Sequence, residues 1–457
     1  MHHSSESSER NAPEERYRWY RDLSRYQWFV LIVAALGWLF DCLDQQLFIL
    51  ARQPAMAELL GGTPTQATID QAGAYATAIF LMGWAIGGLI FGVMGDRIGR
   101  AKTMIVTILL YSVFTGLSAL SIGFWDFSAY RFLTGLGVGG EFAVGVALVA
   151  EVMPARARPY CLSVLQALSV IGNISAAVIG MTMGTLAEQG LVDSIWRPMF
   201  VVGAVPALLA LVVRARLREP DRWQVASHAG ESARKLGSYR ELFGHPTWRR
   251  HALVGLGLAF AGIVALWGVA FFTFDLVGNV LRERFLAEGV ADAQIRGDVA
   301  RWKGIASIMM NVGAAFGMYG FAVLAERVGR KPTFAVCFLA ALASTTSVFY
   351  FLEQFHQIFW MLPIMGFCIF SLFAGYAVYF PELFPTHLRS TGTSFCYNVG
   401  RFVAAIGPAL LGWLTGNLFA HTDEPLRYAG LTMCSVFLLG LCVLPFAPET
   451  KGQPLPE

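Results

Sequence analysis

Long apolar stretches separated by short polar connections fill most of the chain from residue 28 to residue 446. A helix that crosses a membrane needs roughly 20 mostly apolar residues. Twelve stretches of about that length are present, and they predict an all-α integral membrane protein with twelve transmembrane helices. The predicted spans are 28–50, 73–94, 103–122, 127–150, 160–186, 196–215, 251–281, 304–324, 333–352, 357–380, 391–418 and 427–446.

The distribution of Arg and Lys predicts how the spans are oriented, because these residues accumulate in short cytoplasmic loops. The connections after the second, fourth, sixth, eighth and tenth spans carry such residues, whereas 123–126 and 420–425 have none and 51–72 has only Arg52. We therefore expect a multi-pass protein of the cell (inner) membrane with both termini in the cytoplasm. The segment 283–303 mixes both charges, and we expect a short amphipathic helix there on the outside.

Composition supports a membrane protein and excludes several other classes. Residues of the set AVILMFWYC make up 56% of the chain and charged residues only 14%, whereas soluble domains carry roughly 25% charged residues. The net charge of +3 is too small to indicate a nucleic-acid partner. The seven cysteines lie in apolar stretches without metal-ligand spacing. We expect no metal and no cofactor, and the absence of a Ser/His/Asp set or a nucleotide loop argues against an enzyme.

Two motifs occur twice at nearly the same distance along the chain. The sequence GDRIGRAKT at 95–103 returns as AERVGRKPT at 325–333, at an offset of 230 residues, and AEVMP at 150–154 returns as PELFP at 381–385, at an offset of 231. This repeat predicts a duplicated protein of two six-helix halves. The expected organisation is a cytoplasmic N-terminal tail (1–26), an N-terminal bundle (27–215), a cytoplasmic linker (216–249), a C-terminal bundle (250–447) and a cytoplasmic C-terminal tail (448–457).

The repeated loop motif, together with RFLTGLG at 131–137, resembles the signatures of the major facilitator superfamily. The sequences EPDRW at 219–223 and PETKG at 448–452 are similar to paired markers of the branch that holds sugar porters, organic-ion carriers and metabolite:proton symporters. The resemblance covers residues 27–452. It implies a monomer in which two six-helix halves rock around a substrate site near the membrane midplane.

Smaller features narrow the resemblance within that branch. Gln166 followed by Gly172 is similar to sugar porters, but 260–267 lacks the paired glutamines and the asparagine that sugar porters use on hydroxyl groups. The sequence DCLD at 41–44 resembles the Asp-Gly-x-Asp motif of aromatic-acid:proton symporters, with Cys in the Gly position. The sequence GEF at 140–142 is closer to sialate- and lactate-type symporters. The resemblance implies a metabolite:proton symporter without selecting a subfamily.

The resemblance also implies an inner gate that is locked by ion pairs and helix-end dipoles in the repeated loops. The residues expected to form it are Asp96, Arg97, Arg100, Glu151, Glu326, Arg327, Arg330, Glu382 and Arg389.

Ionisable residues inside a membrane span are costly and are therefore functional candidates. Asp41 and Asp44 lie one helical turn apart and share a face of the first span. Two close carboxylates in a low dielectric cannot both be ionised comfortably, so we expect one of them to carry a proton. Glu141 and Arg131 in the fourth span complete the proton-coupling candidates. The alternatives are a polar helix-end pair for the aspartates, a buried pair for Glu141 and a helix-joining role for Arg131.

Arg401 lies about ten residues into the eleventh span, near the midplane. A guanidinium offers a planar fork that matches a carboxylate, so we expect Arg401 to anchor an anionic substrate. The alternative is a structural pair with Asp41, Asp44 or Glu141. Further substrate-binding candidates are Asn398, Tyr397, Gln166, Gln45, Trp267 and Tyr376, among which the aromatic residues fit core packing equally well.

The sequence therefore predicts a secondary active transporter that moves a small organic carboxylate (a monocarboxylate, an aromatic acid or a sugar acid) together with protons. Its expected partners are this organic anion, protons and the lipid bilayer. The first alternative is a facilitative or proton-coupled transporter of sugars or polyols. The second is a non-transporting receptor or sensor on the same fold, for which the linker would be the output.

Overall fold

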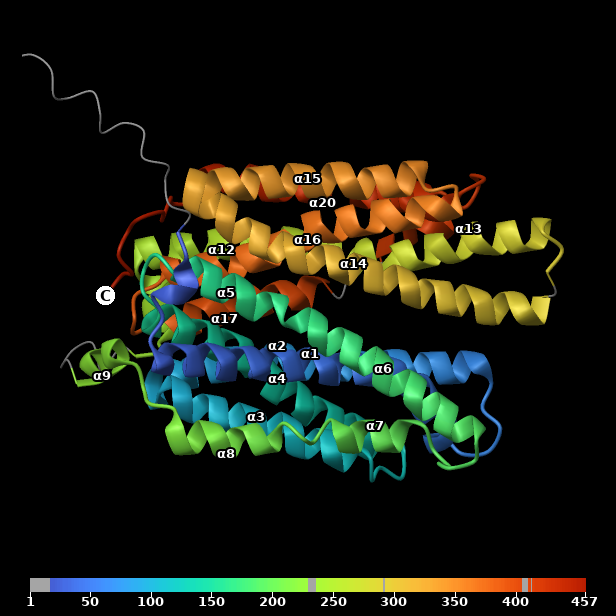
Figure 1. The fold of residues 1–457 in the computed structure, drawn as a ribbon, viewed down its shortest axis with the longest axis horizontal. Helices are drawn as coiled ribbons and strands as arrows, with labels where there is room; N and C mark the ends of the chain where they lie inside the picture. The colour runs from blue at the N-terminus through green and yellow to red at the C-terminus, as the bar shows by residue number, and fades with distance from the viewer. Residues whose placement is uncertain (1–16, 229–235, 291, 405–409, 412) are drawn as a thin grey trace, which may run out of the picture.

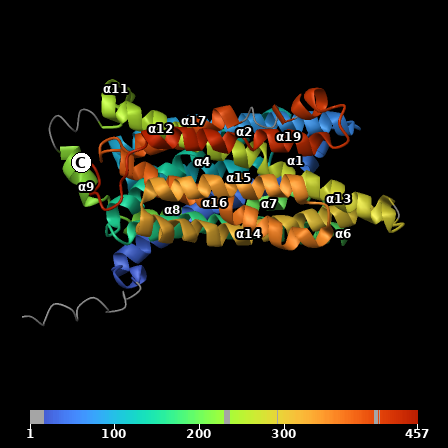
Figure 2. The ribbon, with the colours of Figure 1, turned by 90° about the horizontal axis from the view of Figure 1, so that it is seen from above.

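The structure is a computed structural model, which describes residues 17–457 except 229–235, 291, 405–409 and 412. Its helices run roughly along the long axis of the molecule in two groups, a first half (25–216) and a second half (246–446), which lie side by side (Figure 1). Both ends of the described chain lie at the same end of this bundle, here called the terminal end (Figure 1, Figure 2). The opposite end is called the distal end.

The first half contains α1 (Arg25–Leu59), α2 (Gln66–Ile98), α3 (Arg100–Ser118), α4 (Phe124–Val152), α5 (Arg158–Ala167), α6 (Ser169–Glu188), α7 (Trp196–Val202) and α8 (Ala207–Arg216). The connection carries α9 (Asp221–His228) and α11 (Tyr239–Gly244). The second half contains α12 (Pro246–Gly268), α13 (Thr273–Ala287), α14 (Asp292–Val328), α15 (Arg330–Phe351), α16 (Ile358–Leu383), α17 (Arg389–Ala404), α19 (Pro425–Met433) and α20 (Val436–Val443). Short helical turns are η1 (Trp19–Arg21), η2 (Ala270–Phe272), η3 (Phe355–Gln357), η4 (Leu414–Leu418) and η5 (Leu444–Phe446).

Ten helical stretches in the described residues are long and apolar enough to cross a membrane. They coincide with ten of the predicted spans. The predicted span 196–215 is divided into α7 and α8 by a turn at 203–206, and the predicted span 391–418 crosses residues that the structure does not describe. The prediction of an all-α membrane protein is confirmed.

The expected short outside helix at 283–303 is wrong. The charged residues extend two long helices instead: α13 continues to Ala287, and α14 begins at Asp292, so that the two form a hairpin that projects at the distal end (Figure 1). Gly289, with φ of +73°, makes the turn that ends α13. The mixed charges stabilise the polar helix ends, since Arg284 and Glu288 pair one turn apart at 2.7 Å.

Glycines on α4 allow α2 to pack against it at backbone distance. A Cβ atom added at Gly139 would lie 2.0 Å from the carbonyl oxygen of Trp84, and one added at Gly135 would lie 2.3 Å from the carbonyl oxygen of Phe80. Small residues at such crossings let two membrane helices approach closely. This contact fixes the depth and rotation of Trp84 within the bundle.

We expect Gly139→Ala to destabilise the protein, because the methyl group collides with backbone and not with a side chain that can move. Overpacking a tight core costs typically about 1–3 kcal/mol, so the unfolding temperature of the purified protein should fall by several degrees. Gly184→Ala on α6 is the matched control, since an added Cβ there meets nothing within 4 Å. Equal melting temperatures for the two variants in a fluorescence-detected thermal scan would contradict this packing argument.

The sequence repeat has a structural counterpart at the terminal end. Gly99, between α2 and α3, and Gly329, between α14 and α15, both take positive φ, of 119° and 101°. This backbone conformation is open mainly to glycine. In each half the same sharp turn therefore starts the next helix.

Glutamates from the motifs EPDRW (219–223) and PETKG (448–452) cap the first turns of α3 and α15. The carboxylate of Glu219 accepts from the backbone N–H of Ala101 and Lys102, and that of Glu449 accepts from Arg330 and Lys331 at 2.8 and 3.0 Å. Burial acts to raise the pKa of Glu449, but the backbone donors outweigh it and hold that pKa below its usual value. Glu219 and Glu449 lie 230 residues apart, the same offset as the loop motif.

A segment before α1, residues 17–23, lies across the boundary between the halves. The ring of Trp19 stacks on Tyr160 of α5, with centroids 6.1 Å apart and planes 3° apart. Its indole Nε1 donates to the hydroxyl of Tyr319 on α14 at 3.2 Å. Because α5 and α14 belong to different halves, this aromatic strap joins them near the terminal end.

Candidate functional site

Asp96, close to the end of α2, caps the first turn of α17 in the other half. Its carboxylate accepts from the backbone N–H of Ser390 and Thr391 at 3.1 and 2.8 Å and from Thr391 Oγ1 at 2.6 Å. Since α17 begins at Arg389, the carboxylate meets the positive end of that helix dipole. This is a helix-end contact of the kind that the sequence predicts for the inner gate.

Glu151, near the end of α4, joins two arginines from different halves. Its Oε1 accepts from Arg100 Nη2 at 2.8 Å and from Arg389 Nη1 at 2.7 Å, and all three side chains are fully buried. Arg100 also pairs with Asp96 at 3.1 Å. Burying a charge is costly unless it is paired and hydrogen-bonded. These four residues, Asp96, Arg100, Glu151 and Arg389, are called the gate cluster below.

The second copy of the motif keeps its ion pairs inside the second half. Arg330 binds Glu382 through two nitrogens, at 3.1 and 3.0 Å, and Glu326 at 2.8 Å. Thr450 Oγ1 donates to Glu382 at 2.6 Å. Glu151 therefore connects the halves, whereas its repeat counterpart Glu382 makes no ion pair across them within the described chain.

Two of the expected gate residues belong neither to the gate cluster nor to the ion pairs of Arg330. Arg97 is exposed, and its Nε donates to the carbonyl oxygen of Leu236 in the connection between the halves, at 3.1 Å. Arg327 has an exposed side chain, and its backbone carbonyl accepts from Lys451 Nζ at 2.8 Å. The structure does not bring these two side chains into the gate cluster.

Polar contacts between the halves extend from the gate cluster to about the middle of the bundle. Ser394 Oγ donates to the carbonyl oxygen of Gly88, and Asn398 Nδ2 donates to that of Gly139 at 3.3 Å. Asn173 on α6 donates to Asn311 on α14 at 3.2 Å. The conformation is closed at the terminal end.

Deeper in the bundle, Asp44 and Arg131 form a buried pair between α1 and α4. Asp44 Oδ1 lies 3.4 Å from Arg131 Nη1 and accepts from Thr115 Oγ1 at 2.6 Å. Arg131 donates twice to Ser118 Oγ, at 3.0 and 2.8 Å, and its guanidinium carbon lies 4.5 Å from the ring centre of Phe200. Both residues thus have partners that hold three helices of the first half together.

Asp41, one turn nearer the terminal end, has a different environment. It is 1% exposed, and neither carboxyl oxygen has a hydrogen-bond partner among the described residues. Its electrostatic neighbours are Glu141, Asp44 and Arg401. Glu141 accepts from Thr107 Oγ1 at 2.6 Å through one oxygen only. An unpaired buried carboxyl is stable mainly as the neutral acid, so Asp41 suits a proton-carrying role best.

Arg401 faces this acidic group from α17 of the other half. Its guanidinium carbon lies 3.9 Å from the ring centre of Trp84 and 4.5 Å from that of Tyr397. One nitrogen, Nη1, donates to Asn398 Oδ1 at 3.3 Å, while Nε has no partner within the described residues. Arg401 makes no ion pair at 4.0 Å or less with Asp41, Asp44 or Glu141, so the structural-pair alternative is not realised in this conformation.

The remaining candidates for substrate binding differ in their surroundings and in their distance from Arg401. Tyr397 stacks on Phe142 with centroids 4.1 Å apart, and Gln166 is buried beside it with an unpaired Oε1. Asn398 is an interhelix clip as well as a neighbour of Arg401. Gln45 and Trp267 are half-buried on α1 and α12.

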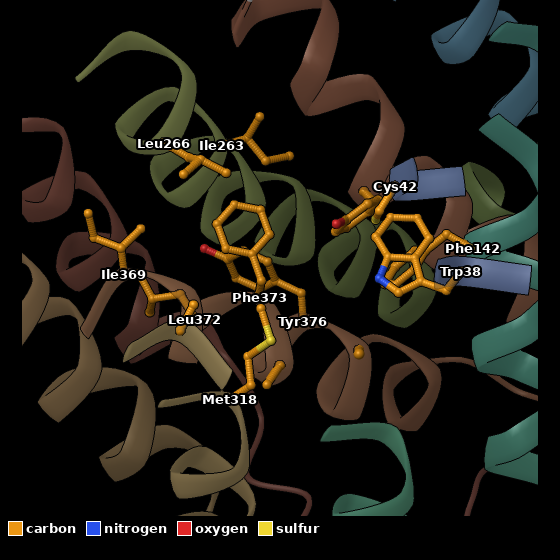
Figure 3. Close-up of a cluster of buried hydrophobic side chains, with 14 of the residues drawn as sticks. Trp38, Cys42, Phe142, Ile263, Leu266, Met318, Ile369, Leu372, Phe373 and Tyr376 are labelled. Carbon is orange, nitrogen blue, oxygen red and sulfur yellow. The ribbon is translucent and has the colours of Figure 1, made fainter. Parts of the chain in front are cut away.

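Tyr376 lies in the apolar packing of the second half. Figure 3 shows it beside Phe373, apart from the group formed by Trp38, Cys42 and Phe142. Its hydroxyl donates to the carbonyl oxygen of Leu258 on α12 at 2.7 Å. The core-packing alternative therefore describes Tyr376 in this conformation.

Three residues that contact the charged groups are missing from the sequence-based prediction. Thr107 and Thr115 bind Glu141 and Asp44, and their spacing of two turns on one face of an apolar span is a signal that could have found them. Trp84 contacts Arg401 across the halves, but nothing in the sequence distinguishes it from other membrane aromatics.

The sequence profile of a family described as sugar (and other) transporters matches residues 55–271 and 291–457. The chain is 31% identical over 442 residues to a protein of Haemophilus influenzae that is named only as a metabolite transport protein, covering 95% of this chain and 99% of that protein. It is 28% identical over 351 residues to the cis,cis-muconate transport protein of Acinetobacter baylyi, covering 74% of this chain and 77% of that protein.

The fold also matches a solved structure along nearly the whole chain. A major facilitator superfamily proton:xylose symporter bound to 6-bromo-6-deoxy-D-glucose aligns with a TM-score of 0.74 at 19% identity, covering 94% of this chain and 98% of that one. At this identity the likeness establishes the shared fold.

Proposed function

Because this chain belongs to the family of sugar and other transporters within the major facilitator superfamily, we propose that it is a proton-coupled symporter of a small organic carboxylate. The chain is thus a multi-pass membrane transporter and not an enzyme, as predicted. We place the terminal end in the cytoplasm, following the distribution of Arg and Lys, and we take the monomer as the working unit.

One observation carries the choice of substrate and coupling ion. In the described structure Arg401 presents its Nε–H without a hydrogen-bond partner, near the carboxyl group of Asp41, which is also unpaired there. A guanidinium edge recognises a carboxylate by charge and by geometry. The muconate transport protein, a relative of this chain, is named for a dicarboxylate.

The same pair provides a way to couple the substrate to the proton. While Asp41 is protonated, it leaves Arg401 free to bind the substrate anion. When Asp41 loses its proton, the new carboxylate competes for the guanidinium and favours release of the anion. The proton and the substrate anion thus both shift the equilibrium between a protonated Asp41 beside a free Arg401 and an ionised Asp41 paired with Arg401. This shared equilibrium couples the binding of the two ligands.

The gate cluster supports alternating access by the two halves. In this conformation it joins the halves at the terminal end, and the pair of Asn173 and Asn311 joins them near the middle of the bundle. We propose that substrate and proton enter from the distal side, and that the gate cluster must separate before they leave on the other side.

A sugar or polyol transporter is the second candidate. It is favoured by Gln166, whose buried Oε1 is unpaired in the described structure and offers a hydroxyl group an acceptor. A neutral sugar makes no use of Arg401, however, and leaves that buried charge without compensation.

Uptake into proteoliposomes distinguishes the two candidates. We would test radiolabelled cis,cis-muconate, benzoate, lactate and xylose, with and without an inward proton gradient. The proposal expects gradient-driven accumulation of at least one acid. Xylose uptake that is independent of the proton gradient, together with no accumulation of any acid, would contradict the symport proposal and favour the sugar candidate.

The variant Asp41→Asn tests the proton step. The amide imitates the neutral acid and cannot release a proton, so we expect loss of gradient-driven accumulation while exchange of labelled for unlabelled acid continues. Asp275→Asn is the matched control, because that carboxylate is 55% exposed and pairs with Lys303 at 2.9 Å. Proton-driven accumulation by Asp41→Asn at the rate of the unmodified protein would rule out Asp41 as the proton carrier.

A further inference from the structure

Arg401 lies at one end of a column of aromatic rings. One face of its guanidinium group contacts the last ring of the column, and the other face contacts Trp84. Trp38 of α1 packs on Phe142 of α4 at 4.5 Å, and Phe142 stacks on Tyr397 at 4.1 Å. The guanidinium of Arg401 follows, at 4.5 Å from the Tyr397 ring and 3.9 Å from the Trp84 ring. The cation is thus held between two rings, one from each half.

This arrangement limits the directions in which Arg401 can donate hydrogen bonds. With the guanidinium carbon 3.9 Å from the ring centre, an N–H pointing straight at Trp84 would crowd the indole, which favours a guanidinium plane that faces the ring. The N–H groups then point outward along the edge of the plane. Asn398 takes one position on that edge, and Nε is left without a partner in the described structure.

The position of Trp84 is itself fixed. The glycines at 135 and 139 bring the α4 backbone against the backbone of Trp84, and Phe80 packs edge-on to its ring at 5.7 Å. Its indole Nε1 has no hydrogen-bond partner among the described residues. The ring therefore acts on Arg401 through its face.

We propose that Trp84 is the positioning residue of the substrate site: it holds the Arg401 guanidinium face-on, so that the edge that carries Nε receives a carboxylate in its plane. This inference rests on the proposed function. Since Trp84 belongs to the first half and Arg401 to the second, the anchor is aligned while the terminal end is closed. It loses this alignment when the halves rearrange.

Transport kinetics of Trp84 variants test the assignment. Loss of a cation–π contact in a desolvated site should make Trp84→Leu raise KM for the transported acid by roughly thirtyfold, the equivalent of about 2 kcal/mol, and leave kcat within about twofold. Trp84→Phe restores a ring face and should recover most of the affinity. Trp125→Leu, at a position 78% exposed, is the control for the loss of an indole as such.

A substrate-independent readout separates this inference from the proposed function. Phenylglyoxal modifies accessible guanidinium groups, and mass spectrometry of the digested protein gives the rate at Arg401. We expect faster modification in Trp84→Leu than in the unmodified protein, with Trp84→Phe close to the latter. If the unmodified protein accumulates no acid, the proposed function fails, and this rate still decides the role of Trp84. Equal rates in all three proteins would overturn the assignment, as would a Trp84→Leu variant with unchanged KM.

Discussion

Replacing Arg401 by Ala is expected to abolish proton-driven accumulation of the transported acid. Among the described charged residues near Asp41, Arg131 pairs with Asp44, whereas Arg401 has no carboxylate partner. Truncating one member of a buried charge pair costs about 2–5 kcal/mol of binding, which is roughly thirtyfold or more in affinity. The measurement is initial uptake into proteoliposomes across a range of acid concentrations.

Arg401→Lys separates charge from geometry. Lysine keeps the positive charge but loses the planar fork and the stacking on two rings, so we expect weak residual uptake with a much higher KM. Thermal stability of both variants shows whether the fold survives the substitution. If Arg401→Ala, in a folded protein, still accumulated the acid with an unchanged KM, the anchor would have to lie elsewhere.

The second large effect is expected at the gate. Glu151→Gln removes the charge that joins Arg100 and Arg389 and leaves two buried guanidinium groups close together. Breaking a buried ion pair by removing one partner costs about 3–5 kcal/mol. Arg100 belongs to the same half as Glu151, whereas the contact with Arg389 crosses the halves and exists only while the terminal end is closed. Loss of that contact should therefore move the equilibrium by roughly a hundredfold or more toward the state that is open there.

Cysteine labelling measures this shift. Ser394→Cys, on the α17 face that meets Gly88 of the other half, should react with a maleimide only when the terminal end opens; the less buried Cys368 and Cys442 are first replaced by Ser. Labelling should be much faster with Glu151→Gln than without it. The matched control is Glu382→Gln, which breaks ion pairs inside one half and should lower stability without faster labelling. Equal acceleration by both substitutions would contradict the assignment of Glu151 to the gate.

Features that repeat along the chain could be predicted from the sequence. The apolar spans follow from the thickness of the bilayer, and the duplicated loop motif reappears as Gly99 and Gly329, which make the same turn in both halves. The confirmed features are the all-α membrane fold and the transporter family. The division of the chain at 216–249 and the roles of the site residues stay predictions.

Contacts between spans could not be predicted, because they depend on helix rotation and depth. The sequence suggests that Asp41 and Asp44 act together, yet Asp44 has Arg131 as a partner and Asp41 has none in the described structure. Likewise, a repeat makes Glu151 and Glu382 equivalent, and only their surroundings make one a bridge between the halves. The hairpin of α13 and α14 was missed because mixed charge suits a helix end in water as well as a separate short helix.

Both ends of the described chain are tied to the part of the molecule that must open. Trp19 joins α5 to α14, and the carbonyl oxygen of Pro456, one residue from the end, accepts from Arg389 Nη2 at 2.8 Å. A purification tag or fluorescent fusion attached after the C-terminal residue would therefore begin within reach of the moving parts. Transport rates measured on such fusions would include any hindrance of gate opening by the tag. Kinetic comparisons therefore call for protein from which the tag has been cleaved.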